Sequence, residues 1–181
     1  IGYFARLAPE KGLHVLAEAY RILRRERYLP PSRLRAAGFC GPDQHAYLDN
    51  VRRSLRAEGL EDEFDYAGSP DRGGTFAFLR ELDVFSVPSP YREPKGLYLL
   101  EAMAAGLCVL VSNIPENMES IDHSGITFVN ANPDDLRAQL QKLINHPEIV
   151  LERGRRGRDW VKIAFSWDRI AEETEQVYRM A

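Results

Sequence analysis

Short apolar runs alternate with longer amphipathic segments along most of this chain, and this alternation constrains the fold more than any other feature. The apolar runs are 1–5, 34–38, 64–68, 83–87, 107–112 and 126–129. The segments between them carry apolar residues at helical spacing: 12–27, 44–59, 73–82, 97–106, 115–123 and 133–146. Strands that alternate with helices form right-handed βαβ units. The sequence therefore predicts an α/β fold, a Rossmann-like parallel sheet of about six strands with helices on both faces.

Residues 147–181 differ from the rest because they show helical patterns and no strand pattern. We expect residues 1–146 to form one domain and residues 147–181 to form a helical extension that packs on the sheet or reaches toward another domain. Ser166 is expected to cap the last helix. Two tryptophans, Trp160 and Trp167, are expected to pack the tail helices down. A basic cluster is expected to form a solvated helix face: Arg153, Arg155, Arg156 and Arg158.

Charge and composition exclude several classes of partner. The chain has 24 basic and 27 acidic residues and a net charge of -3, so it lacks the general positive field that holds nucleic acid or an anionic membrane. No apolar stretch approaches the roughly 20 residues that span a bilayer. The two cysteines, Cys40 and Cys108, have no Cys/His cluster around them, so we expect no metal site. The lack of a signal peptide favours a cytoplasmic location, and the start at Ile1 favours a piece of a longer protein.

The loop that follows the first expected strand carries two candidate phosphate-binding cations. Ligands of an open parallel sheet bind beyond the carboxyl ends of its strands, so such loops matter most. In residues 6–12, Arg6 and Lys11 stand beside the start of a helix, and two cations with a helix N-terminus suit a diphosphate. The loop lacks G-x-G-x-x-G, which argues against a dinucleotide site. By spacing alone, two solvated surface cations are an equal alternative.

A second candidate loop follows the fourth expected strand and opens the helix at 97–106. It places Glu93 just before that helix and Glu101 in its second turn, so that both can face one crevice. Gly96 allows a ligand to approach the backbone closely, and the N–H groups of Gly96 and Leu97 are expected to point at a phosphate. A carboxylate in an otherwise apolar helix needs a partner if it is buried, and ribose hydroxyls suit it. The alternative is that Glu101 faces solvent.

These motifs resemble the C-terminal domain of retaining GT-B glycosyltransferases of the family called glycosyl transferases group 1, which includes glycogen-synthase-like and sucrose-synthase-like enzymes. The resemblance covers roughly residues 1–146 and rests most on segment 88–106, where Glu93 and Glu101 are separated by seven residues. Its other parts are Gly2, Arg6-Leu7, Glu10-Lys11-Gly12 and the strand and loop 64–68. The sequence departs from the family pattern at Lys95, where an apolar residue is usual, at Cys108 and at 113–116.

The resemblance implies that the chain binds a nucleoside diphosphate sugar (UDP-, ADP- or GDP-) as substrate, without a cofactor or a metal. It implies a catalytic group of three residues. Arg6 and Lys11 bind the diphosphate and offset the charge of the leaving nucleotide, and Glu93 orients the transferred sugar. The sugar then passes to an acceptor with retention of configuration.

The resemblance also implies a donor-binding group. Glu101 holds the ribose hydroxyls, Gly96 and Leu97 donate backbone hydrogen bonds, and Gly68 borders the base. Lys95 adds a third cation near the diphosphate or is a surface lysine.

The same resemblance implies a partner, an N-terminal GT-B domain that binds the acceptor, and this chain alone is then expected to bind its donor without turnover. Three other functions compete. The chain could be half of a GT-B epimerase, although that class lacks the paired glutamates. It could be a non-catalytic module that binds nucleotide sugars or acts as a scaffold. A flavodoxin-like signalling domain requires an acidic cluster where this chain has Arg6.

Overall fold

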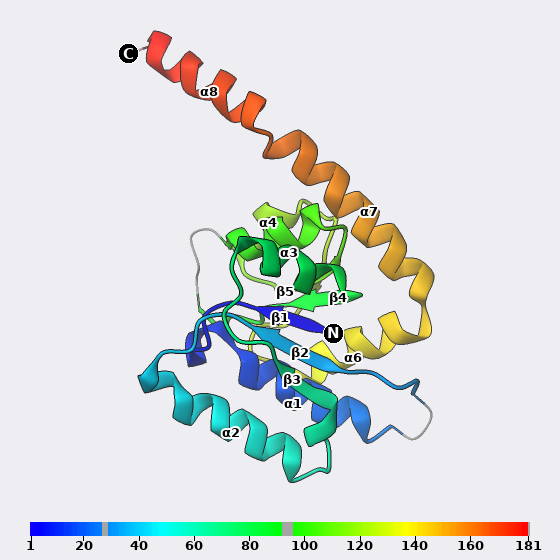
Figure 1. The fold of residues 1–181 in the computed structure, drawn as a ribbon. Helices are drawn as coiled ribbons and strands as arrows, with labels where there is room; N and C mark the ends of the chain where they lie inside the picture. The colour runs from blue at the N-terminus through cyan, green and yellow to red at the C-terminus, as the bar shows by residue number, and fades with distance from the viewer. Residues whose placement is uncertain (27–28, 92–95, 181) are drawn as a thin grey trace.

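The computed structural model, which describes residues 1–26, 29–91 and 96–180, contains one six-stranded sheet (Figure 1). The sheet order is β3-β2-β1-β4-β5-β6, and all of its strand pairs are parallel. The strands are β1 (Gly2–Phe4), β2 (Leu34–Ala37), β3 (Phe64–Tyr66), β4 (Val84–Ser86), β5 (Cys108–Ser112) and β6 (Ile126–Phe128). The six expected strands are confirmed, and each is shorter than its apolar run.

Helices cover both faces of this sheet. The main ones are α1 (Leu13–Arg24), α2 (His45–Arg56), α3 (Arg72–Arg80), α4 (Leu97–Ala104), α5 (Pro115–Ile121) and α6 (Pro133–Asn145). Three short 3-10 helices join them: η1 (Pro9–Lys11), η2 (Pro42–Gln44) and η3 (Glu61–Glu63). Helix α1 packs against α2 and α6 on one face, whereas α4 packs against α5 and the following helix α7 (Pro147–Ala164) on the other. The predicted α/β fold is therefore confirmed.

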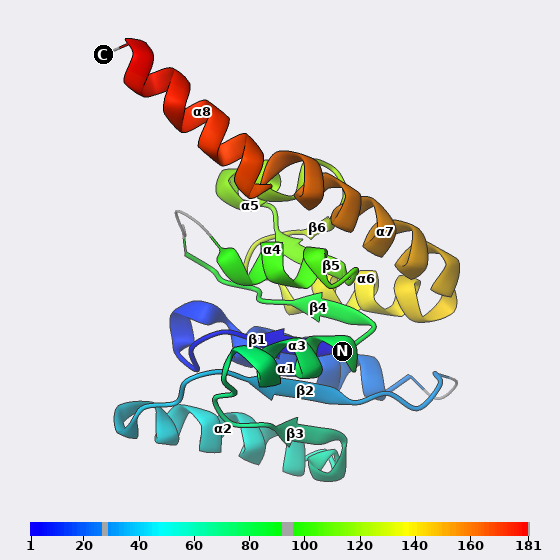
Figure 2. The same ribbon diagram turned by 45° about the horizontal axis from the view of Figure 1, so that its top comes forward.

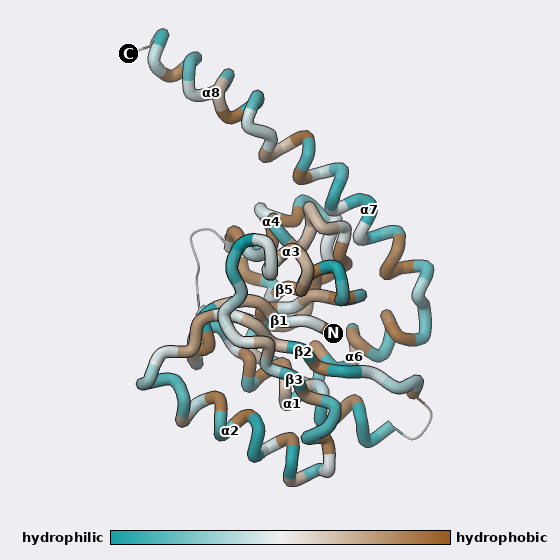
Figure 3. The backbone as a smooth tube through the Cα atoms, viewed as in Figure 1, coloured by the Kyte–Doolittle hydropathy of each residue, from teal (hydrophilic) through white to brown (hydrophobic). Residues whose placement is uncertain are grey.

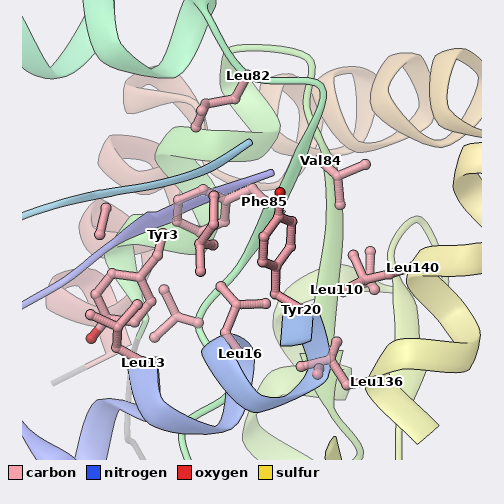
Figure 4. Packing of buried hydrophobic residues seen from close by; sticks show 14 of the residues in the cluster. Tyr3, Leu13, Leu16, Tyr20, Leu82, Val84, Phe85, Leu110, Leu136 and Leu140 are labelled. Carbon is pink, nitrogen blue, oxygen red and sulfur yellow. The ribbon is translucent and has the colours of Figure 1, made fainter. Parts of the chain in front are cut away.

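The core lies between α1 and the central strands (Figure 4). Tyr3 of β1 and Phe85 of β4 are fully buried, and α1 meets them with Leu13, Leu16 and Tyr20. These helix positions recur at three- and four-residue spacing, which places them on one face. Each fully buried side chain of this size contributes roughly 2 kcal/mol through the removal of apolar surface from water. This packing fixes the start of α1 against the sheet, and the start of α1 borders the candidate site.

Helix α7 packs closely against the domain because it carries small residues where it touches the sheet. A Cβ atom at Gly154 would lie 2.1 Å from the carbonyl oxygen of Gly106, so only glycine fits there. Trp160 is half-buried and donates its indole N–H to the carbonyl of Ser120 at 3.1 Å, as expected of a residue that packs the tail down. Within the described residues, none of these helices is long and apolar enough to cross a membrane.

The last helix, α8 (Trp167–Met180), leaves the domain (Figures 1 and 3). The expected cap is confirmed, since the N–H of Arg169 donates to the hydroxyl of Ser166 at 3.3 Å. The expectation for Trp167 is wrong: its side chain is 84% exposed, because α8 buries no residue on the domain.

The basic cluster on α7 is solvated with one exception. Arg155, Arg156 and Arg158 are exposed, as expected. Arg153 is half-buried instead and donates to the carbonyls of His123 (2.7 Å) and Gly125 (3.3 Å). It thereby holds the loop between α5 and β6 against the tail.

Candidate functional site

The candidate site lies at the point where the direction of the sheet order reverses. Strands β1 and β4 are neighbours and run in parallel, but β1 leads to α1 on one face and β4 leads to α4 on the other. Two loops that diverge in this way leave a crevice beyond the carboxyl ends of the strands. Figure 2 shows the loop after β1 and the start of α4 at the same end of the sheet. The two loops predicted from sequence to carry the site are therefore brought together.

The loop after β1 carries Arg6 and Lys11. The hydroxyl of Tyr3 donates to the carbonyl of Arg6 at 3.0 Å and fixes the point where the chain leaves the strand. The Arg6 side chain is 49% exposed and forms an ion pair with Glu10, one turn further along. Exposed pairs of this kind contribute little free energy. A phosphate can therefore replace Glu10 as the partner of Arg6 at small cost.

Lys11 connects this loop to α4. Its Nζ atom lies 5.7 Å from the centre of the Tyr98 ring, in the first turn of α4. The Tyr98 ring in turn lies 6.4 Å from that of Phe85 on β4, so the aromatic surface under the lysine continues into the sheet. A cation over an aromatic face is stabilised by the ring quadrupole. Lys11 is thus placed beside the first turn of the helix that was predicted to face the same ligand.

Helix α4 begins at Leu97, with Gly96 as its N-terminal cap residue. Gly96 is buried, whereas Leu97 is exposed. The first N–H groups of a helix have no partner within it, and the helix dipole makes this end positive. The other two predicted residues of this loop, Glu93 and Lys95, lie outside the described residues.

Glu101 lies in the second turn of α4, as predicted, and is exposed. Partial desolvation raises the pKa of Glu101 above its usual value, and the positive charge of Arg72 at the start of α3 lowers it in part. Within the described ranges, no hydrogen bond or ion pair joins Glu101 to another side chain. Its carboxylate can therefore accept hydrogen bonds from ligand hydroxyls.

Gly68 follows β3 at the same edge of the sheet. Its φ angle is +76°, a left-handed conformation that favours glycine, and a Cβ atom there would meet nothing within 4 Å. Its carbonyl accepts the N–H of Gly38, after β2, at 2.8 Å. The loop is therefore anchored by its backbone and open on its outer side.

Ser89, Ser112 and Asn130 also belong to this edge, and the sequence pattern assigned no role to any of them. Ser89 and Ser112 are buried and donate hydrogen bonds to loop carbonyls, and the Asn130 side chain donates to the carbonyl of Pro90 at 3.0 Å. A serine at the end of an apolar strand run, as in 107–112, was the available signal, because a buried hydroxyl needs a partner. Arg72 was missed for lack of any local pattern.

A separate cavity of about 490 Å³ lies between α1 and α2, next to the hydrogen-bonded pair of His14 and Tyr47 (3.0 Å). It shares Pro9 with the loop after β1 but none of the predicted site residues. Across the part of the chain that the structure describes, no three His, Cys, Asp or Glu side chains are grouped so as to hold a metal ion.

Comparison with known sequences gives a consistent set of relatives. The family model described as Glycosyl transferases group 1 matches residues 1–160. A glycogen synthase of Mycobacterium tuberculosis is 35% identical over 184 residues, which cover 99% of this chain and 42% of that protein. An uncharacterized glycosyltransferase of Methanocaldococcus jannaschii, MJ1607, is 31% identical, with 99% of this chain and 44% of that protein covered. The chain spans less than half the length of these relatives.

Solved structures share the fold. Anabaena Alr3699/HepE in complex with UDP superposes with a TM-score of 0.88 at 20% identity, over 99% of this chain and 48% of that one. The C-terminal domain of LpcC from Francisella tularensis, a glycosyl transferase group 1 family protein, superposes with a TM-score of 0.82 at 22% identity, over 92% of this chain and 85% of that domain. The fold is therefore that of one half of HepE.

Proposed function

Because this chain belongs to the glycosyl transferases group 1, we propose that it is the half of a glycosyltransferase that holds a nucleoside diphosphate sugar. The observation that carries the proposal is the position of Lys11, whose ammonium group lies over Tyr98 in the first turn of α4. A point charge and the positive end of a helix thus lie side by side. A pyrophosphate is the group that this pair of features recognises.

The proposed roles are those that the family motif implies for these residues. Arg6 and Lys11 bind the diphosphate, and Arg6 exchanges its ion pair with Glu10 for a phosphate. The N–H groups of Gly96 and Leu97 donate to phosphate or sugar. Preorganised donors of this kind stabilise the charge that develops on a departing diphosphate.

The remaining roles extend outward from the diphosphate. Glu101 accepts hydrogen bonds from the ribose hydroxyls, and Gly68 borders the base. For two residues outside the described ranges the proposal rests on the family motif alone: Glu93 contacts the transferred sugar, and Lys95 adds positive charge. The transfer then proceeds with retention of configuration and without a metal.

A second domain completes the proposed enzyme. The relatives are more than twice as long as the matched region, since it covers 42% and 44% of them. We propose that residues 1–146 form the donor-binding domain with 147–181 as its extension, and that the acceptor binds between this domain and a partner domain. The apolar stripe of α8, defined as Trp167, Ile170, Val177 and Tyr178, is exposed and is the surface proposed to pack on that partner.

Binding measurements on this chain test the proposal. We expect one of UDP, ADP or GDP, and the matching sugar nucleotide, to raise the melting temperature by mass action, with calorimetry giving the affinity. A chelator should leave that affinity unchanged. The free nucleoside should bind more weakly, because it lacks the diphosphate. If none of the three diphosphates binds at millimolar concentration, the proposal is wrong.

A further inference from the structure

Two contacts join the loop after β1 to the loop after β4, and neither involves a predicted donor-binding side chain. The first is a close approach of backbones. Gly12 has a φ angle of +76°, and a Cβ atom on it would lie 2.1 Å from the carbonyl oxygen of Pro88. The second is a hydrogen bond from the hydroxyl of Ser89 to the carbonyl of Glu10 at 2.8 Å. Adjacent residues of one loop thus contact residues on either side of Lys11.

Ser89 is buried, so its hydroxyl must be accounted for by its hydrogen bonds and not by packing alone. The residue is 2% exposed, and a buried hydroxyl without a partner costs free energy that an alanine would not. Besides Glu10, its hydroxyl lies 3.2 Å from the carbonyl of Tyr91, two residues further along the loop after β4. One side chain therefore reaches the backbone of both loops.

A hydrogen bond from the neighbouring strand β5 in turn fixes the backbone of Ser89. The hydroxyl of Ser112, at the end of β5 and fully buried, donates to the carbonyl of Ser89 at 3.0 Å. The amide of Asn117 in turn donates to the carbonyl of Ser112 at 3.2 Å. This chain of hydrogen bonds runs along the edge of the sheet from α5 to η1, and Ser89 is the link between the loop after β4 and the loop after β1.

We propose that Ser89 is a positioning residue for the donor diphosphate: its hydroxyl holds the loop of Arg6 and Lys11 against the loop after β4. The inference rests on the proposed function, because it concerns the same ligand. Ser89 is buried within the loop after β4, and its hydroxyl donates to the backbone of the loop after β1. Its removal should therefore separate the diphosphate-binding groups without removing any of them.

Ser86 provides a matched control. It lies three residues earlier, is also fully buried, and donates its hydroxyl to one carbonyl, that of Leu110 on β5, at 3.0 Å. Ser86→Ala and Ser89→Ala remove the same atom from the same segment, but only Ser89 bonds across to the loop after β1. We expect both variants to lower the melting temperature to a similar degree.

Calorimetry with the nucleoside diphosphate that wild type binds separates the two variants. Ser89→Ala should weaken binding of the diphosphate about tenfold and that of the nucleoside less than about twofold, whereas Ser86→Ala should change neither by more than about twofold. Equal effects of the two variants on diphosphate binding overturn the proposal. So does an equal loss of diphosphate and nucleoside binding by Ser89→Ala.

Amide hydrogen exchange tests the same contact without a ligand. Ser89→Ala should speed exchange at Lys11 and Gly12, whose N–H groups donate to the carbonyls of Ala8 and Pro9, and Ser86→Ala should not. If wild type binds no diphosphate, the proposed function fails and this measurement still decides the positioning role. Unchanged exchange at both amides in Ser89→Ala contradicts it.

Discussion

At the scale of single residues, Lys11 is the group on which the proposed diphosphate site depends most. It lies beside α4, whereas Arg6 points to Glu10 within its own loop. The two cations are therefore not equivalent. Lys11 already lies over a ring in the first turn of α4, whereas the Arg6 side chain is held by Glu10 within its own loop.

This difference predicts unequal effects of substitution. Lys11→Ala should weaken nucleoside diphosphate binding about tenfold or more, the usual scale for losing a charge-assisted hydrogen bond, and Arg6→Ala should weaken it less. Calorimetry with the diphosphate and with the free nucleoside checks this. Equal losses for both ligands would remove the phosphate role. Glu10→Gln is the control, since it releases Arg6 and should leave binding unchanged or tighten it.

Glu101 gives a prediction about ribose. Glu101→Ala should reduce the preference for the ribose form of the nucleotide over its 2'-deoxy form, because the variant has no acceptor for the hydroxyls. An unchanged preference in the variant would show that another group holds the ribose.

The same carboxylate predicts a pH dependence. Only its ionised form accepts hydrogen bonds with both oxygens, and burial raises its pKa. The preference for ribose should therefore fall as the pH is lowered through that raised pKa, at a higher pH than for a glutamate whose pKa is not raised. Calorimetry of the two nucleotides between pH 7 and pH 5 checks it, and a constant ratio over this range would contradict it.

At the scale of elements, hydrophobic spacing predicted which segments form strands and helices, and helix boundaries followed from local signals. Ser166 could be predicted as a cap because serine before a helical pattern has one common role. The sequence could not show that Trp160 packs against the domain whereas Trp167 faces solvent. Both are large aromatic residues in a helical tail, and only the path of the chain after α7 makes one half-buried and the other exposed.

The site shows the same division. Arg6, Lys11 and Glu101 could be proposed from the sequence because they stand in loops or helix turns that follow strands. Ser89 and Ser112 received no role from the sequence because their contacts are with segments far away in sequence, such as the carbonyl of Glu10. Whether a small polar residue is buried can be predicted only when the strand order is known.

Helix α7 gives a prediction about element packing. Gly154→Ala should lower the free energy of unfolding by about 2 kcal/mol, because the added methyl group overlaps the carbonyl of Gly106 and forces α7 away from the sheet. Gly73→Ala, in the exposed first turn of α3, is the control and should change it by less than about 0.5 kcal/mol. Chemical denaturation measures both. Similar values for the two variants would mean that α7 does not pack as described.

At the scale of the whole molecule, α8 is the helix that packing on the domain does not stabilise. Its apolar stripe lies on one helix face, yet none of its residues is buried. Figure 3 shows α8 extending away from the domain. Isolated helices shorter than about 12–15 residues are marginal in water, so a helix without a packing surface is weakly stabilised.

Hydrogen exchange should therefore distinguish α8 from α7. In this chain alone, the amides of α8 should exchange fast and those of α7 slowly. In a longer protein that carries the proposed partner domain, α8 should become protected, and replacing Trp167 and Val177 with glutamine should reverse that protection. Equal protection of both helices in this chain alone would contradict the prediction.

The place of β1 in the sheet has a consequence for how this domain forms. The first strand of the chain is a central one, flanked by β2 on one side and by β4 on the other. The sheet therefore cannot grow outward from one edge in the order of synthesis, and its middle closes only after the segment carrying β4 has emerged. High contact order of this kind slows folding. A chain that ends before β4 should consequently stay without a stable tertiary structure.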